Sequence, residues 1–204
     1  MCIRDRPITD HELARILKSL AREFDDASQE EEAYTIASAV SNKLDTEQAS
    51  HFSPGIQFRM LLLCIGPLMN NASQISHSRI YMNIWKKIDL QSLLEQNQIV
   101  WKRKWVCYGW SVNQKYIVWD SQEKVPAETA LSGFLKTTGE YTNGYPVNLC
   151  ILPGEVTIHQ LHQGALMLQE TLNRTLVIGK SNLIKEEECG ISLSLIHISE
   201  PTRH

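Results

Sequence analysis

Several signatures of catalysis and metal binding are missing from this sequence. It has no C-x-x-C pair, which argues against a zinc ribbon or a redox motif, and no G-x-S-x-G elbow of the kind that presents a nucleophilic serine. Repeats and low-complexity segments are missing as well. We therefore nominate no catalytic residue and expect no cofactor. Whether the chain is an enzyme stays uncertain, and a non-enzymatic role is favoured.

Charge of one sign is not in excess either. The chain has 20 Lys+Arg against 23 Asp+Glu, a net charge of −3, which is typical of a soluble protein rather than a strongly basic nucleic-acid binder or an acidic tail. The apolar run 60–65 is far too short to cross a bilayer. We expect no membrane span and a cytoplasmic location.

The cysteines are few and widely spaced. Cys64, Cys107, Cys150 and Cys189 lie about forty residues apart. This spacing fits buried or free thiols in a reducing compartment, although disulfide pairing stays open.

Both ends of the sequence resemble library adapters. Residues 1–6 back-translate to the mosaic end that transposases use in sequencing-library preparation, and residues 193–204 back-translate to its reverse complement. We expect both segments to be adapter-derived scars and exclude them from fold reasoning. The segment 7–192 is then the native part, an internal fragment of a longer product.

Residues 7–98 have helical patterning. Capping boxes at 9–12 and 28–31 each precede an apolar stripe at helical spacing, which predicts an antiparallel helical pair. Ser53-Pro54 predicts a third helix running through the apolar segment 60–65. A fourth helix is expected around 80–88, and a fifth, capped by Asp89, over 90–96.

Residues 99–192 change to a period typical of strands. A hairpin with its tip at Asn113-Gln114 would place Trp110 opposite Ile117 and Tyr108 opposite Trp119, with both faces of the ribbon buried. A helix is expected from Pro126. A strand over 147–152, a helix from about 157 and a strand over 175–178 form a β-α-β unit, so these strands should be parallel with a right-handed crossover. The predicted fold is α+β, with an N-terminal helical half packed on a C-terminal mixed sheet. From their combined length we expect residues 7–98 and 99–192 to belong to the same domain.

The first candidate site is a basic and aromatic run. Trp101, Lys102, Arg103 and Lys104 combine charges that seek phosphate with a face on which a base can stack, and Lys86, Lys87 and Lys115 lie nearby in the sequence. Against this, tryptophans in strands are usually core, and a basic run at a strand's start is often a solvated edge.

The second candidate site is a crevice at the carboxyl ends of the two parallel strands. Gly154 and Glu155 (after Pro153) follow one strand, and Gly179, Lys180 and Ser181 follow the other, so a small anionic ligand could bind between them. A phosphate loop is rejected because Arg174 stands where its first glycine should be. The alternative is that these are ordinary loop residues.

A metal site is not expected. His159 and His162 lie three residues apart on a helix, with Glu155 near in sequence, but His162 falls on the apolar stripe, where a hydrogen-bonded core histidine is commoner. The leading hypothesis is a non-enzymatic binding or assembly module whose partner, protein or nucleic acid, is undecided. The alternative is an enzyme that uses the crevice.

Overall fold

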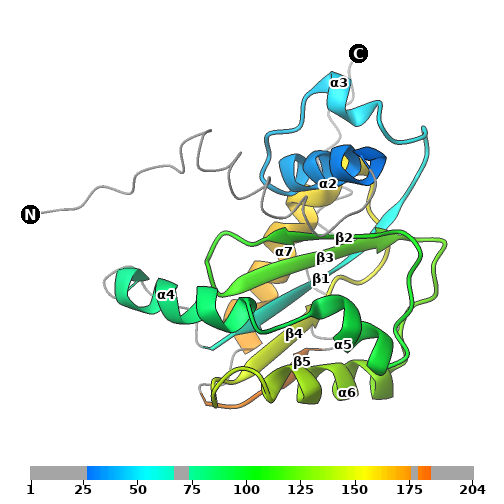
Figure 1. Cartoon of the computed structure of the whole chain (residues 1–204). Helices are drawn as coiled ribbons and strands as arrows, with labels where there is room; N and C mark the ends of the chain where they lie inside the picture. Colours follow the sequence, from blue (N-terminus) through cyan, green and yellow to red (C-terminus); the bar gives the residue numbers. More distant parts are fainter. Residues whose placement is uncertain (1–26, 67–73, 176–178, 185–204) are drawn as a thin grey trace, which may run out of the picture.

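The chain has an α+β fold in which helices cover both faces of a mixed sheet (Figure 1). The computed structural model describes residues 27–66, 74–175 and 179–184. Its helices are α2 Ala27–Val40, α3 Thr46–Ala49, α4 Gln74–Trp85, α5 Leu90–Gln96, α6 Glu128–Gly139, the 3₁₀ turn η1 Ile158–Gln160 and α7 Leu161–Thr175. Its strands are β1 Phe58–Ile65, β2 Lys104–Tyr108, β3 Gln114–Asp120, β4 Val147–Ile151 and β5 Asn182–Ile184.

The described strands form one sheet in the order β2-β3-β1-β4-β5. β1 is central and runs antiparallel to both of its neighbours, β3 and β4. β2 pairs antiparallel with β3 at one edge, and β5 pairs parallel with β4 at the other. The strand that follows α7 is therefore parallel to β4, as predicted, but it is Asn182–Ile184 rather than 175–178.

The central strand is the main correction to the sequence-based prediction. Residues 60–65 were predicted to be helical, but Phe58–Ile65 is β1, and almost every residue in it is buried. Met60, Leu62 and Cys64 face one core, while Leu61, Leu63 and Ile65 face the other. A strand that is buried on both faces has no alternation of apolar and polar residues, so its periodicity cannot distinguish it from a buried helix. The sheet therefore draws its middle strand from the half that was expected to be helical.

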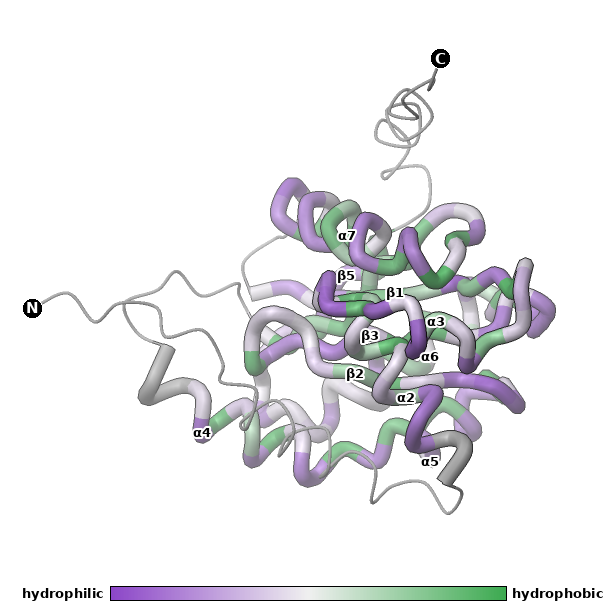
Figure 2. Tube along the Cα trace, turned by 90° about the horizontal axis from the view of Figure 1, so that it is seen from above, coloured by the Kyte–Doolittle hydropathy of each residue, from purple (hydrophilic) through white to green (hydrophobic). Residues whose placement is uncertain are grey.

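Two hydrophobic cores lie on opposite faces of the sheet. α2, η1 and α7 cover one face, and α4, α5 and α6 cover the other. Figure 2 shows α7 and the α4–α5 pair on opposite sides of the strands, with hydrophilic residues concentrated on the outer helices. This arrangement is a three-layer sandwich whose cores meet only through the sheet.

The aromatic hairpin forms with a different register from the predicted one. Tyr108 pairs with Lys115 and Lys104 with Trp119, so Trp110 lies beyond the ladder. The amide of Gln114 donates to Ser111 O at 3.0 Å, which places the turn one residue earlier than expected. Asn113 is drawn inward because its side-chain amide donates to Ile65 O at 2.9 Å.

The last strand also lies elsewhere. A strand was predicted over 175–178, but Thr175 ends α7, and its hydroxyl donates to Thr171 O as a helical residue's would. Residues 176–178 lie outside the described part, and β5 begins at Asn182. Thr175 is β-branched, a residue type enriched in strands, although here it is the last residue of α7.

The remaining described helices confirm their predictions. α2, α4, α5, α6 and α7 form where periodicity placed them, and the Asp89 side chain caps α5 by accepting from Ser92 N. The helix expected after residues 9–12 and both adapter-like ends lie outside the described residues. In the part of the chain that the structure describes, no helix combines the length and apolar character needed to span a membrane.

Candidate functional site

Trp101 belongs to the core. Its side chain is 3% exposed, and its ring stacks on Trp119 with centroids 4.4 Å apart and planes 13° from parallel. Its indole N–H donates to Lys124 O at 3.0 Å. A ring held in this way offers no face to a nucleic-acid base, so the aromatic half of the first candidate site is not at the surface.

The basic residues beside Trp101 are compensated by acids. Arg103 forms ion pairs with Glu32 at 2.8 Å and Asp120 at 3.4 Å. Partial burial lowers the pKa of Lys104, and Glu95 and Glu123 act in the opposite direction. Lys104 Nζ also donates to Trp101 O at 3.2 Å.

Lys102 completes the 101–104 run and is exposed, but an acid lies beside it too. Its backbone N–H donates to the Glu123 carboxylate at 3.0 Å. The run predicted from sequence therefore lies among carboxylates, which weaken its attraction for phosphate.

The predicted crevice does not assemble. The hydroxyl of Ser181 accepts from the amide of Val147, the first residue of β4, at 2.9 Å. Gly179, Lys180 and Ser181 therefore lie at the amino end of β4, because they precede β5 rather than follow it. Gly154 and Glu155 lie past the opposite end of β4, across a strand about 13 Å long. Glu155 is instead paired with Arg59, with 2.9 Å between Nη2 and Oε1.

The two histidines of α7 and η1 do not gather ligands. His162 is half-buried, and its Nδ1 donates to Val40 O at 2.9 Å, whereas His159 is exposed. Among residues 27–66, 74–175 and 179–184, no three His, Cys, Asp or Glu side chains come together in a way that could hold a metal ion.

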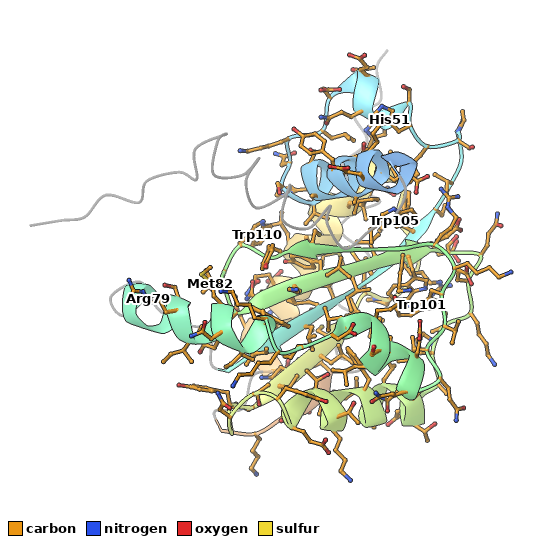
Figure 3. The ribbon with its side chains drawn as sticks, viewed as in Figure 1. His51, Arg79, Met82, Trp101, Trp105 and Trp110 are labelled. Carbon is orange, nitrogen blue, oxygen red and sulfur yellow. The ribbon has the colours of Figure 1, made fainter. Side chains whose placement is uncertain are left out.

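A different surface forms where the β2–β3 loop meets α4. We define the hairpin-end surface as Tyr108, Trp110 and Val112 on the hairpin, Arg79 and Met82 on α4, and Lys86 directly after α4. Trp110 is 45% exposed, Val112 41% and Met82 54%. Figure 3 shows Trp110, Met82 and Arg79 at the same end of the molecule, remote from Trp101. Large apolar side chains are thus exposed together with cations.

Trp110 is exposed but held in place. Its ring packs edge-on against Tyr116, with centroids 6.5 Å apart, and lies 5.8 Å from the ring of His162. Tyr116 is fully buried, and His162 is fixed by its bond to Val40 O. The indole therefore projects from a rigid base, which lowers the entropy that a contact through it would lose.

Trp85, the last residue of α4, connects this helix to the hairpin. Trp85 Nε1 donates to Val112 O at 2.8 Å. The ammonium group of Lys115 lies 4.9 Å from the Trp85 ring centroid and 5.1 Å from that of Tyr108. Cation–π contacts of this kind stabilise partly buried positions by about 1–2 kcal/mol each. The helix and the loop are therefore joined at this end of the sheet, with Trp110 packed on the α7 side and α4 on the opposite side.

The outer face of α4 adds charge to this surface. Tyr81, Ile84 and Trp85 are buried, so the helical period places Arg79, Met82 and Lys86 on the exposed side. No aspartate or glutamate occurs over 74–88 or 99–119. Within the described residues, no ion pair is formed by Arg79 or Lys86. Sequence reasoning noted Lys86 but missed Arg79, Met82 and Val112, and these acid-free stretches were the signal that could have found them.

A buried polar row crosses the sheet on the α7 side. Gln114, Cys64 and Asn148 are direct cross-strand neighbours on β3, β1 and β4. Gln114 Oε1 and both amide atoms of Asn148 are buried without a hydrogen-bond partner. Burial raises the pKa of the Cys64 thiol to about 12, so this row carries no charge at neutral pH. The row offers hydrogen bonds but no nucleophile.

No family model matches the chain, and no curated protein matches it significantly.

Proposed function

We propose that the chain is a non-enzymatic binding module that contacts its partner through the hairpin-end surface. The observation that carries this proposal is the exposure of Trp110 and Val112 on the hairpin, with Met82 exposed on α4 at the same end of the molecule (Figure 3). Large apolar side chains that gather at a surface are typical of interaction sites, whereas scattered ones are ordinary.

The residue types on this surface support a contact role. Tryptophan, tyrosine, methionine and arginine are the residues enriched where proteins bind partners, and tryptophan and arginine dominate binding energy. Trp110 packs against Tyr116 and His162, so its side chain loses little conformational entropy on binding.

The two sites expected from sequence receive less support. The 101–104 run has its tryptophan buried and Arg103 paired with two carboxylates. The alternative function, an enzyme that binds a small anion in the crevice, needs 153–155 and 179–181 to be neighbours. β4 separates them.

The proposal is tested by sedimentation velocity of the chain, alone and mixed with single-stranded RNA, for the wild type and Trp110→Ala. We expect the wild type to form a complex, either with RNA or with a second copy, and Trp110→Ala to lose most of it. Circular dichroism would verify that the variant is folded. If neither complex forms, or if the complex is indifferent to Trp110, the hairpin-end surface is not a contact surface.

A further inference from the structure

We infer that the partner of the hairpin-end surface is a single-stranded nucleic acid, an inference that rests on the proposed function. Its basis is charge complementarity combined with an exposed ring. Single strands are bound by grooves or faces that pair cations for the phosphates with aromatic rings for the bases. The hairpin-end surface has both within one rigid unit.

The charges at this end are cationic although the whole chain is net negative. Arg79 lies on α4 and Lys86 directly follows it, and the stretches 74–88 and 99–119 contain seven lysines and arginines and no acid. Four of these seven, Lys102, Arg103, Lys104 and Lys115, are on the hairpin or just before it, and the first three lie among carboxylates at its far end. The exposed cations at this end, Arg79 and Lys86, therefore lie on or directly after α4, and the loop 109–113 contributes none.

The ring available for stacking is Trp110. Its indole leans on Tyr116 and His162 while 45% of the side chain remains exposed, so a base can lie against it without rearrangement of the loop. Val112 is exposed two residues further along the loop, and Met82 is exposed on α4 at the same end of the molecule (Figure 3). Because every base has a π face, such a site tolerates many sequences.

Charge also distinguishes this partner from a second copy of the chain. A symmetric dimer through the hairpin end would bring the same cations of two copies together, which is unfavourable without intervening anions. A duplex is disfavoured because its bases are already stacked and paired, so Trp110 would have nothing to stack on. An unpaired strand offers phosphates to the cations and unstacked bases to the Trp110 ring.

The test is fluorescence anisotropy with a labelled single strand of about 16 nucleotides, and with a duplex of the same length, titrated with the full chain. We expect the single strand to bind with an affinity that falls roughly tenfold between about 50 and 200 mM salt, as two or three phosphate contacts require. Trp110→Ala should weaken binding about tenfold, and Trp110→Phe should restore most of the loss.

A pair of charge variants isolates the contribution of α4. Arg79→Gln with Lys86→Gln should weaken binding and reduce the slope of log affinity against log salt by about 1.4, because each lost single-strand contact removes about 0.7. Lys136→Gln, on α6 and exposed, is the matched control and should leave binding unchanged. Thermal melting would establish that each variant is folded.

The outcomes separate this inference from the proposed function. Binding that is insensitive to salt, equally tight for duplex, or unaffected by Trp110→Ala and the α4 pair overturns the nucleic-acid inference. If the strand does not bind but Trp110→Ala abolishes self-association, the inference fails and the proposed function stands. If neither partner depends on Trp110, both fail.

Discussion

The indole rings of Trp101 and Trp119 lie stacked with their centroids 4.4 Å apart, closing the core beneath α5 and β3. This contact removes Trp101 from the surface and leaves Trp110 as the exposed tryptophan of the hairpin. The two tryptophans, nine residues apart, therefore have opposite roles, and their substitution should have opposite consequences.

Trp101→Ala should destabilise the fold by about 3–5 kcal/mol, because it removes a buried ring and leaves a cavity against Trp119. Trp110→Ala should change the free energy of unfolding by less than about 1 kcal/mol, since the ring is half exposed. Urea denaturation of both variants measures the difference. Equal losses would mean that Trp110 is a core residue and would remove the basis for a contact role.

Asn148→Val should leave stability unchanged or raise it by about 1–3 kcal/mol. Both side-chain amide atoms of Asn148 are buried without partners, so replacing them with methyl groups removes a desolvation penalty. Asn113→Val is the matched control and should destabilise, because it breaks the bond to Ile65 O. If Asn148→Val destabilises as much as Asn113→Val, the Asn148 amide has a stabilising partner.

The separation of the two loops around β4 gives a third prediction. Ser181→Ala should cost about 1–2 kcal/mol by leaving the Val147 amide without its acceptor, whereas Lys180→Ala, at an exposed position, should be neutral. Chemical denaturation checks both. A neutral Ser181→Ala would contradict the placement of residues 179–181 at the start of β4.

The buried thiols predict a loss of stability at high pH. Burial raises the pKa values of Cys64 and Cys107 from 9.0 to about 12. The unfolded chain therefore releases these protons first, and stability should fall as pH rises from about 9 towards 12, by up to about 1.4 kcal/mol per pH unit for each thiol. Below pH 9 the stabilisation is fully present.

Urea unfolding between pH 8 and 11 under reducing conditions measures this slope, and Cys64→Ala with Cys107→Ala should flatten it. A variant whose slope equals that of the wild type would show that the thiols ionise in the folded protein. Cys150 is also buried and is not in a disulfide, whereas Cys189 lies outside the described residues.

The helices could be predicted from the sequence because their signals are local. Apolar stripes at helical spacing and an N-cap such as Asp89 located α2, α4, α5, α6 and α7, because both signals are local. The prediction also placed Ile117 and Trp119 on one face of the hairpin, and they share one core. Side chains alternate between the two faces of a strand, so a shift of the pairing register by an even number of residues leaves each residue on the same face.

The predictions for β1, the hairpin tip and the exposed residues of α4 failed because these features depend on tertiary contacts. β1 reads like a helix because both of its faces are buried. The hairpin tip moved because Asn113 bonds to the end of β1, a strand that local reasoning had not found. The exposed group on α4 was missed for the same reason, since only the Trp85 bond to Val112 shows that α4 and the loop share a surface.

The most direct test of the contact surface is a comparison of two variants with one labelled single strand at fixed, low salt. Trp110→Ala alters the hairpin end, and the double variant Lys102→Gln, Lys104→Gln alters the run at the other end of the same hairpin. The dissociation constant of Trp110→Ala should rise about tenfold, while that of the double variant should change by less than about threefold. A large loss for the lysine variant with none for Trp110→Ala would contradict the assignment and return the site to residues 101–104.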